Sequence, residues 1–181
     1  MTTVINLLGA PGAGKTIAAM DLCSMLRKDY VHAELISEAA KDHIYDGTES
    51  SEIDQLAIFA EQYKRVKRLN GKVKFIISDS PLFLSGFYAQ KYGYHSGFSK
   101  YSIQVANEFK NLNFLIHRHH RYDPNGRSQT EEESNAIHVE LKDYMYLHNV
   151  DYIPVIASAD ARGVTGCDIV YATLKREGLL T

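Results

Sequence analysis

The sequence predicts an α/β fold in which a five-stranded parallel sheet is covered by helices on both faces. Five short apolar segments alternate along the 181 residues with segments whose apolar residues recur at helical spacing. Short apolar strands that alternate with helices are typical of a parallel sheet buried on both sides. The chain length suits one domain with a full core, and no internal repeat, linker or low-complexity tract divides it.

The predicted elements follow one another in a regular order. Short apolar runs predict five strands, at residues 4–8, 31–36, 73–78, 112–117 and 152–156. Helical spacing of apolar residues predicts seven helices, at residues 17–28, 39–44, 53–69, 81–92, 100–110, 131–147 and 160–176. Local signals mark several ends: Asn70 and Gly71 stop the third helix, Pro81 begins the fourth, and Gly93 interrupts it.

Between the first strand and the first helix lies the pattern G-x-x-x-x-G-K-[ST]. Its residues are Gly9, Ala10, Pro11, Gly12, Ala13, Gly14, Lys15 and Thr16. A glycine-rich loop in this setting turns backbone N–H groups toward phosphate oxygens, with Lys15 reaching the terminal phosphates and the Thr16 hydroxyl holding Mg²⁺. The alternative is a tight turn with no ligand. Because the motif has both its strand and its helix, we predict a nucleoside triphosphate site with ATP and Mg²⁺ as cofactors.

Two acids follow strands of the predicted sheet. Ligands of such sheets bind beyond the carboxyl ends of the strands, so these acids are candidates for the same site. Asp79 follows a hydrophobic strand, as a magnesium-orienting acid does, although it also suits a helix N-cap. Glu38 follows the second strand, where it is a candidate to orient an acceptor hydroxyl as general base; the alternative is an acid that stabilises a helix N-terminus.

The polar segment of residues 118–130 follows the fourth strand and carries Arg118, Arg121 and Arg127. We predict a mobile lid whose arginines place positive charge over the γ-phosphate, with Arg118 also contacting the nucleotide. The alternative is a solvated loop whose arginines offset the three glutamates at 131–133.

Aromatic side chains are dense over residues 87–101. A nucleobase or nicotinamide ring stacks on such side chains, and we expect Tyr88 and Tyr92 to form the walls of the acceptor pocket. Aromatic residues at helical spacing are equally typical of a core, and the sequence alone leaves both interpretations open.

The composition gives little support for DNA or a membrane as a partner. A net charge of −2 gives no broad positive field, so any contact with DNA has to be local and DNA is not the favoured partner. Cys23 and Cys167 form no C-x-x-C pair and are expected to be reduced thiols. No signal segment and no bilayer-length apolar run is found, so we expect a soluble cytoplasmic protein with no membrane contact. The oligomeric state is left open.

With these residues assembled, the chain resembles the P-loop kinases of the nucleoside and nucleotide kinase group. The closest likeness is to the ATPase-like domain of nicotinamide riboside kinases and to related small AAA-type ATP-binding proteins often encoded by bacteriophages. The resemblance covers nearly the whole chain. The stretches that carry it are residues 9–16, 37–41, 78–79 and 122–132.

This resemblance implies the three-layer P-loop NTPase fold and one kinase domain over residues 1–181. By this resemblance, Lys15 and Thr16 hold phosphate and magnesium. Glu38 and Asp79 face the acceptor and the metal. Arg121 or Arg127 serves as the lid arginine. One departure is that Ser80 and Pro81 stand where many nucleotide kinases carry an arginine directly after the acid. The acceptor class therefore stays open.

The sequence thus predicts an ATP-dependent phosphotransferase that moves the γ-phosphate to a nucleoside, a nucleotide or a related small acceptor. One alternative is a kinase that acts on a hydroxymethylated base in DNA, which needs a flipped base and a basic surface. Another is an ATP-hydrolysing switch or regulatory ATP-binding protein, although no N-K-x-D guanine-reading motif is present. The sequence does not decide whether Glu38 or Asp79 is the general base.

Overall fold

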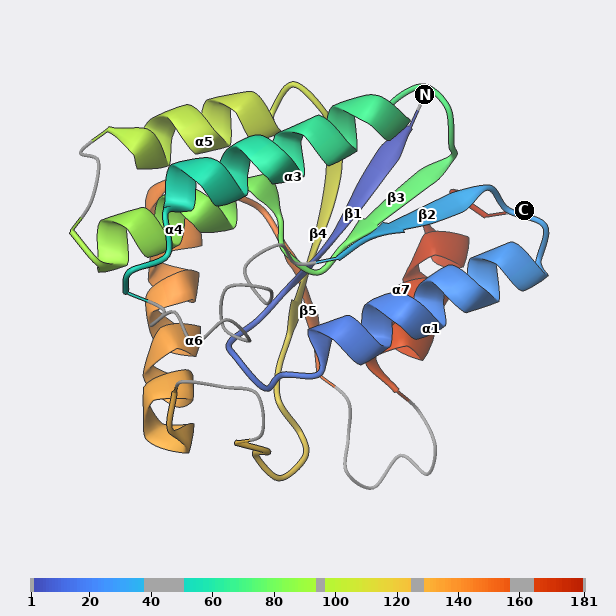
Figure 1. Ribbon diagram of the computed structural model, residues 1–181. Helices are drawn as coiled ribbons and strands as arrows, with labels where there is room; N and C mark the ends of the chain where they lie inside the picture. Colours follow the sequence, from blue (N-terminus) through green and yellow to red (C-terminus); the bar gives the residue numbers. More distant parts are fainter. Residues whose placement is uncertain (1, 38–50, 94–96, 125–128, 157–164, 181) are drawn as a thin grey trace.

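Five parallel strands form the sheet at the centre of the molecule (Figure 1). The computed structural model describes residues 2–37, 51–93, 97–124, 129–156 and 165–180. The strands are β1 (Thr3–Leu8), β2 (Ala33–Ile36), β3 (Phe75–Ser78), β4 (Lys110–Ile116) and β5 (Ile153–Val155). Their order across the sheet is β2-β3-β1-β4-β5, and every neighbouring pair is parallel. The predicted α/β class is confirmed.

Helices cover both faces of the sheet (Figure 1). One face carries α1 (Lys15–Lys28) and α7 (Gly166–Arg176), and the other carries α3 (Gln55–Leu69), α4 (Leu82–Lys91), α5 (Phe98–Ala106) and α6 (Glu131–Leu147). Successive residues of β1 alternate between the two cores: Ile5 packs with α1 and α7, whereas Leu8 packs with α4, α5 and α6. This alternation produces the three layers.

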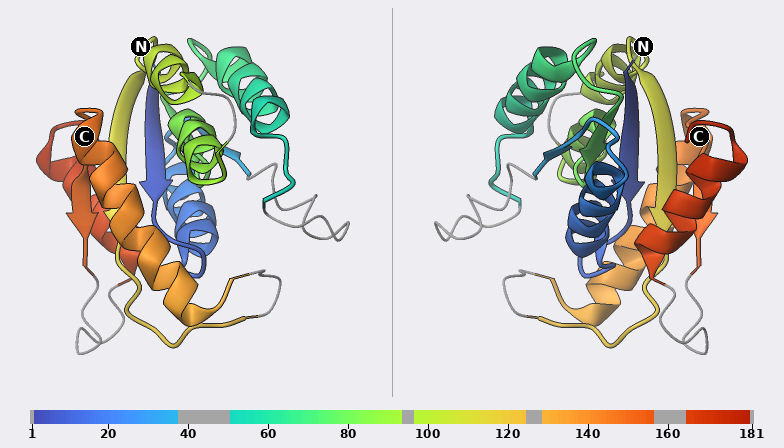
Figure 2. Two further views of the ribbon diagram at one scale, coloured as in Figure 1. Left: turned by 90° about the vertical axis from the view of Figure 1, so that its left-hand side faces the viewer. Right: turned by 90° about the vertical axis from the view of Figure 1, so that its right-hand side faces the viewer.

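Parallel strands bring their carboxyl ends to one edge of the sheet. The turn after β1 and the segment after β4 accordingly lie at the same end of the molecule (Figure 2). Asp79, which directly follows β3, shares this edge. Among the described helices, none has the length and apolar character needed to cross a membrane.

The connection from α5 to β4 differs from the prediction. The helix expected over residues 100–110 ends at Ala106, and the strand begins at Lys110. The Asn111 side chain, on β4, donates hydrogen bonds to the carbonyl oxygens of Ala106 at 2.7 Å and Phe109 at 3.0 Å. These bonds hold the last carbonyl of the helix and the turn that follows it, and so lead the chain into the sheet. Helical spacing alone could not reveal this cap. The helix predicted at 39–44 lies outside the described residues.

We expect Gly86→Ala to destabilise the protein by about 1–3 kcal/mol. A Cβ at this position of α4 would overlap Ser102 Oγ and lie 2.9 Å from both Ser99 Cα and Tyr144 Oη. This overlap outweighs the helix-propensity gain of about 1 kcal/mol. Urea unfolding measures the change. The control is Gly166→Ala in α7, whose Cβ would meet only ordinary contacts at 3.7 and 3.9 Å. Equal stability of the two variants would contradict this prediction.

Candidate active site

The predicted phosphate-binding loop, residues 9–16 (the P-loop), runs from β1 into the first turn of α1. Gly9 has a φ of 150°, and a Cβ there would lie 2.8 Å from the Ile116 carbonyl oxygen at the end of β4. Gly14, the N-cap of α1, is left-handed with a φ of 86°. Glycine is required at both positions, because a side chain would clash at Gly9 and be strained at Gly14. The loop can therefore lie against β4 beside the α1 N-terminus.

The Lys15 ammonium lies within the P-loop. Its Nζ donates hydrogen bonds to the carbonyl oxygens of Gly9 at 2.9 Å and Ala10 at 3.0 Å. The loop thus combines a positive side chain with a helix N-terminus, and both of these favour an anion. The geometry suits a phosphate group.

Thr16 and Asp79 meet at the junction of α1 and β3. Thr16 Oγ1 donates a hydrogen bond of 2.7 Å to Asp79 Oδ2. Asp79 is only 1% exposed, and its Oδ1 is buried without a hydrogen-bond partner among the described residues. The helix that follows is capped at Pro81, with no side-chain capping bond. A buried carboxylate oxygen without a partner is costly, so this oxygen calls for a donor or a cation.

Mg²⁺ fits these two side chains. This ion is usually bound through one or two protein oxygens, substrate phosphates and several waters rather than by a full protein cage. Thr16 and Asp79 are the residues that would hold it beside the P-loop. Within the described part of the chain, no three or more His, Cys, Asp or Glu side chains gather as a metal site, and a magnesium site of this kind needs none.

The segment after β4 begins with Arg118, whose Nη2 donates to Glu131 Oε1 at 2.9 Å and to Asn135 Oδ1 at 2.6 Å on α6. Arg121 is exposed. Two of the predicted site residues, Glu38 and Arg127, lie outside the described residues. The structure therefore brings Lys15, Thr16, Asp79 and Arg118 to one edge of the sheet.

Tyr88 and Tyr92 stack on each other near the end of α4. Their ring centroids are 6.2 Å apart with 14° between the planes, and both side chains are partly buried. Tyr88 also packs edge-on against Phe87 in the core. Burial raises the pKa of Tyr92, and the carboxylates of Glu140 and Glu133 on α6 raise it further. The pair thus lies at the boundary of the core, between α4 and α6.

Sequence reasoning did not single out Ser134 and His138 on α6. Ser134 Oγ donates a 2.6 Å hydrogen bond to the Pro11 carbonyl of the P-loop. Both residues line a pocket of about 210 Å³ beside the P-loop. The full lining is Ala10, Ala13, His117, Arg118, Ser134, Asn135 and His138. The one available signal was a polar residue, Ser134, on the buried stripe of a helix.

We expect stability to fall as the pH drops below about 6.5, the ordinary histidine value. The rings of His117 and His138 lie 4.6 Å apart. Burial lowers the pKa of His117, and the charge of Lys142 lowers it further. Burial also lowers the pKa of His138, and His117 and Lys142 lower it further. Since the unfolded chain takes up these protons more readily, stability present above that pH is lost on acidification.

Urea unfolding at pH 7.5 and 5.5 tests this effect. His138→Gln should reduce the loss of stability between the two conditions. His32→Gln, at an exposed histidine, serves as the matched control and should leave the loss unchanged. A pH dependence that is the same in both variants would contradict the assignment.

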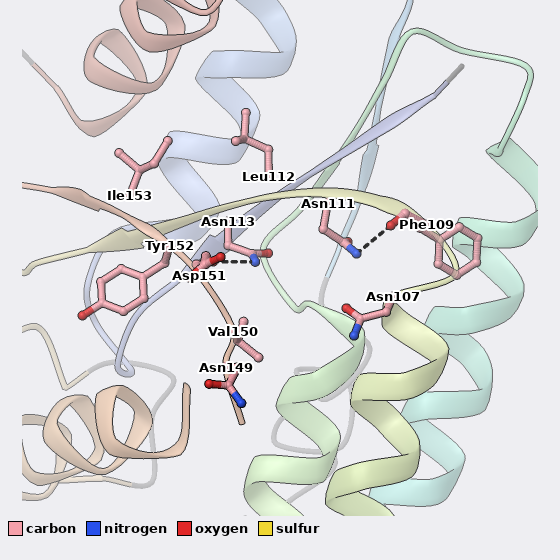
Figure 3. A pocket seen from close by; sticks show the side chains of 10 residues that line it. All are labelled: Asn107, Phe109, Asn111, Leu112, Asn113, Asn149, Val150, Asp151, Tyr152 and Ile153. Carbon is pink, nitrogen blue, oxygen red and sulfur yellow. Dashed lines mark hydrogen bonds between the residues drawn. The ribbon is translucent and has the colours of Figure 1, made fainter. Parts of the chain in front are cut away.

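A larger pocket, about 440 Å³, lies near the amino end of β4 and away from the P-loop (Figure 3). Its lining is rich in asparagines. Asn6 Nδ2 donates to the Oδ1 atoms of Asn111 and Asn113 at 2.9 and 2.8 Å, and Asn113 Nδ2 donates to the Asp151 carbonyl at 2.9 Å. These carboxamides join β1, β4 and the start of β5. We assign them a structural role, because they bond mainly to one another and to the backbone.

The fold and the P-loop edge define this chain as an α/β domain with a P-loop. A family model described as an AAA domain matches residues 4–162, and the chain belongs to this family. No curated protein is detectably similar to the chain in sequence.

Several solved structures share the fold. NadR, solved in complex with NR, superposes with a TM-score of 0.73 at 16% identity. The match covers 98% of this chain but only 52% of the NadR chain, so this chain spans about half the length of NadR. Thymidylate kinase from Ehrlichia chaffeensis gives a TM-score of 0.60 at 13% identity, covering 98% of this chain and 99% of that one. Deoxyadenosine kinase from M. mycoides, with bound dATP, gives a TM-score of 0.56 at 16% identity. The match covers 95% of this chain and 98% of the deoxyadenosine kinase chain. The predicted three-layer P-loop NTPase fold is thus confirmed.

Proposed function

We propose that this protein is an ATP-dependent kinase that transfers the γ-phosphate to a nucleoside, a nucleotide or a related small acceptor. The observation that carries the proposal is the Thr16–Asp79 pair, with its buried unpartnered carboxylate oxygen, beside a P-loop that contains Lys15. A fold shared with kinases of small nucleosides and nucleotides supports the acceptor class. The whole chain, residues 1–181, then acts as one kinase domain.

On the donor side, the P-loop N–H groups and Lys15 bind and orient the phosphates of ATP. Lys15 Nζ, which bonds to loop carbonyls at 2.9 and 3.0 Å, reorients toward the phosphate oxygens. Thr16 and Asp79 would hold Mg²⁺, which would neutralise charge on the phosphates. Arg121 and Arg127, in the proposed lid at 118–130, add positive charge over the transferring group and exclude water.

On the acceptor side, Tyr88 and Tyr92 form one wall of the pocket for the base or nicotinamide ring. Asp79 is already bonded to Thr16. The general base is then Glu38, which by its place after β2 accepts the proton of the acceptor hydroxyl. This assignment separates the two acids, one toward the metal and one toward the acceptor.

ADP release from ATP and Mg²⁺ tests the proposal. The protein is assayed alone, with nucleosides, with nucleoside monophosphates, with nicotinamide riboside and with hydroxymethylated DNA. We expect slow release alone and a marked rise with one small acceptor. A rise with DNA only would overturn the acceptor class, and steady release that no acceptor changes would indicate a hydrolysing switch instead.

A further inference from the structure

Arg118 begins segment 118–130, and its guanidinium holds the residues that follow the end of the same segment. Nη2 donates to Glu131 Oε1 at 2.9 Å and to Asn135 Oδ1 at 2.6 Å. The Arg118 side chain is only 13% exposed, the least of any cation in the described ion pairs. A charged hydrogen bond shielded from solvent is stronger than a surface ion pair. This contact can therefore fix the position of Arg118 against α6.

Tyr122 makes a second connection between the two ends of the segment. The Arg118 guanidinium carbon lies 5.0 Å from the centre of the Tyr122 ring, within cation–π range. Tyr122 Oη donates a 2.5 Å hydrogen bond to the Gln129 carbonyl. We call the set Arg118, Tyr122, Gln129, Glu131 and Asn135 the Arg118 clamp.

The clamp is connected to the P-loop through α6. Thr130 and Glu133 form a capping box that fixes the first turn of this helix. In the same turn Ser134, 1% exposed, donates its 2.6 Å hydrogen bond to the Pro11 carbonyl. A continuous set of hydrogen bonds and helix turns therefore runs from Arg118 to the loop that receives the phosphates.

We propose that Arg118 is a positioning residue, which sets the path of residues 118–124 relative to the P-loop. Its Nη2 is bonded to Glu131 and its face is covered by Tyr122, whereas Nη1 is buried without a hydrogen-bond partner among the described residues. We assign Arg118 to the clamp, because these two contacts fix its position, and not to the phosphates. Arg121, which is exposed and lies three residues further along, is the cation whose approach to the transferring group this path would set. Preorganising such a residue speeds transfer because less conformational freedom is lost in the transition state. The inference rests on the proposed kinase function.

Arg118→Ala tests the proposal by steady-state kinetics. We expect kcat for transfer to fall by about 10- to 100-fold. The affinity for ATP should change by less than about 3-fold, because no nucleotide contact is removed. Arg118→Lys should resemble Arg118→Ala, since an ammonium lacks the planar fork that reaches two acceptors and stacks on a ring. Arg27→Ala, which removes an exposed ion pair with Glu34 far from the site, is the matched control.

Asn135→Ala breaks the same clamp from α6. It provides a second test of the proposal in case Arg118→Ala does not fold. It should lower kcat in the same direction, and the double variant should be little worse than Arg118→Ala alone, because the two residues share one interaction. Wild-type kcat in folded Arg118→Ala would overturn the proposal. Full activity of Arg118→Lys would also overturn it, because charge alone would then suffice.

Limited trypsin digestion gives a test that does not depend on kinase activity. Cleavage after the exposed Arg121 should be about tenfold faster in Arg118→Ala than in the wild type, since the segment is released from α6. Unchanged cleavage would contradict the clamp even if transfer is observed. If the wild type transfers no phosphate while cleavage accelerates as expected, the proposed function fails and the clamp stands.

Discussion

Lys15→Ala is expected to reduce phosphoryl transfer by about 100-fold or more. The Lys15 ammonium is the cation inside the P-loop, bonded at 2.9 and 3.0 Å to carbonyls of that loop. Without it, the charge that develops on the terminal phosphate loses its nearest stabilising partner within the loop. The fold itself should tolerate the change, because the lost bonds join Lys15 to carbonyls of the P-loop and Lys15 is not part of the apolar core.

Two measurements check the Lys15 prediction. ADP release gives the loss of activity, and the rise in melting temperature on adding ATP gives the loss of binding. Lys28→Ala, an exposed lysine at the other end of α1, is the control and should behave like the wild type. If Lys15→Ala keeps wild-type activity while folded, the phosphate site lies elsewhere.

Asp79→Asn is expected to lower transfer by about 100-fold and to raise the Mg²⁺ concentration needed for half-maximal activity by about tenfold or more. Asparagine keeps the shape of the side chain and can still accept the Thr16 hydrogen bond. It removes the negative charge at the buried oxygen that has no hydrogen-bond partner among the described residues. The loss should therefore fall on metal binding rather than on folding.

The comparison of thermal shifts with ATP alone and with ATP plus Mg²⁺ isolates this effect. In the wild type the added Mg²⁺ should increase the shift, and in Asp79→Asn most of that increase should be lost. Asp143→Asn, at an exposed aspartate of α6, is the matched control. An unchanged Mg²⁺ response in Asp79→Asn would show that this carboxylate does not hold the ion.

The sequence predicted those elements whose limits are encoded locally. The predicted helix at 131–147 matches α6 residue for residue, because Thr130 and Glu133 form a capping box at its start and apolar spacing continues to its end. The α5–β4 boundary was wrong, because the cap comes from Asn111 across the turn. Local propensity does not report such a contact.

The same distinction applies to the candidate site. The P-loop and Asp79 could be placed together from the sequence, because parallel strands deliver their following residues to one edge. The contacts of Ser134 with Pro11, of Arg118 with Asn135 and of His117 with His138 could not. These depend on how α6 is rotated against the end of β4, and side-chain packing throughout the core decides that rotation.

The most direct test of the kinase account follows the γ-phosphate itself. The protein is incubated with ATP labelled at the γ-position, Mg²⁺ and the acceptor that most stimulates ADP release, and the label is traced by mass spectrometry. The account predicts that the label appears on the organic acceptor in equal amount to the ADP formed, and that Lys15→Ala abolishes both. Label found only in inorganic phosphate would contradict phosphoryl transfer to an acceptor and would leave a P-loop domain that hydrolyses ATP.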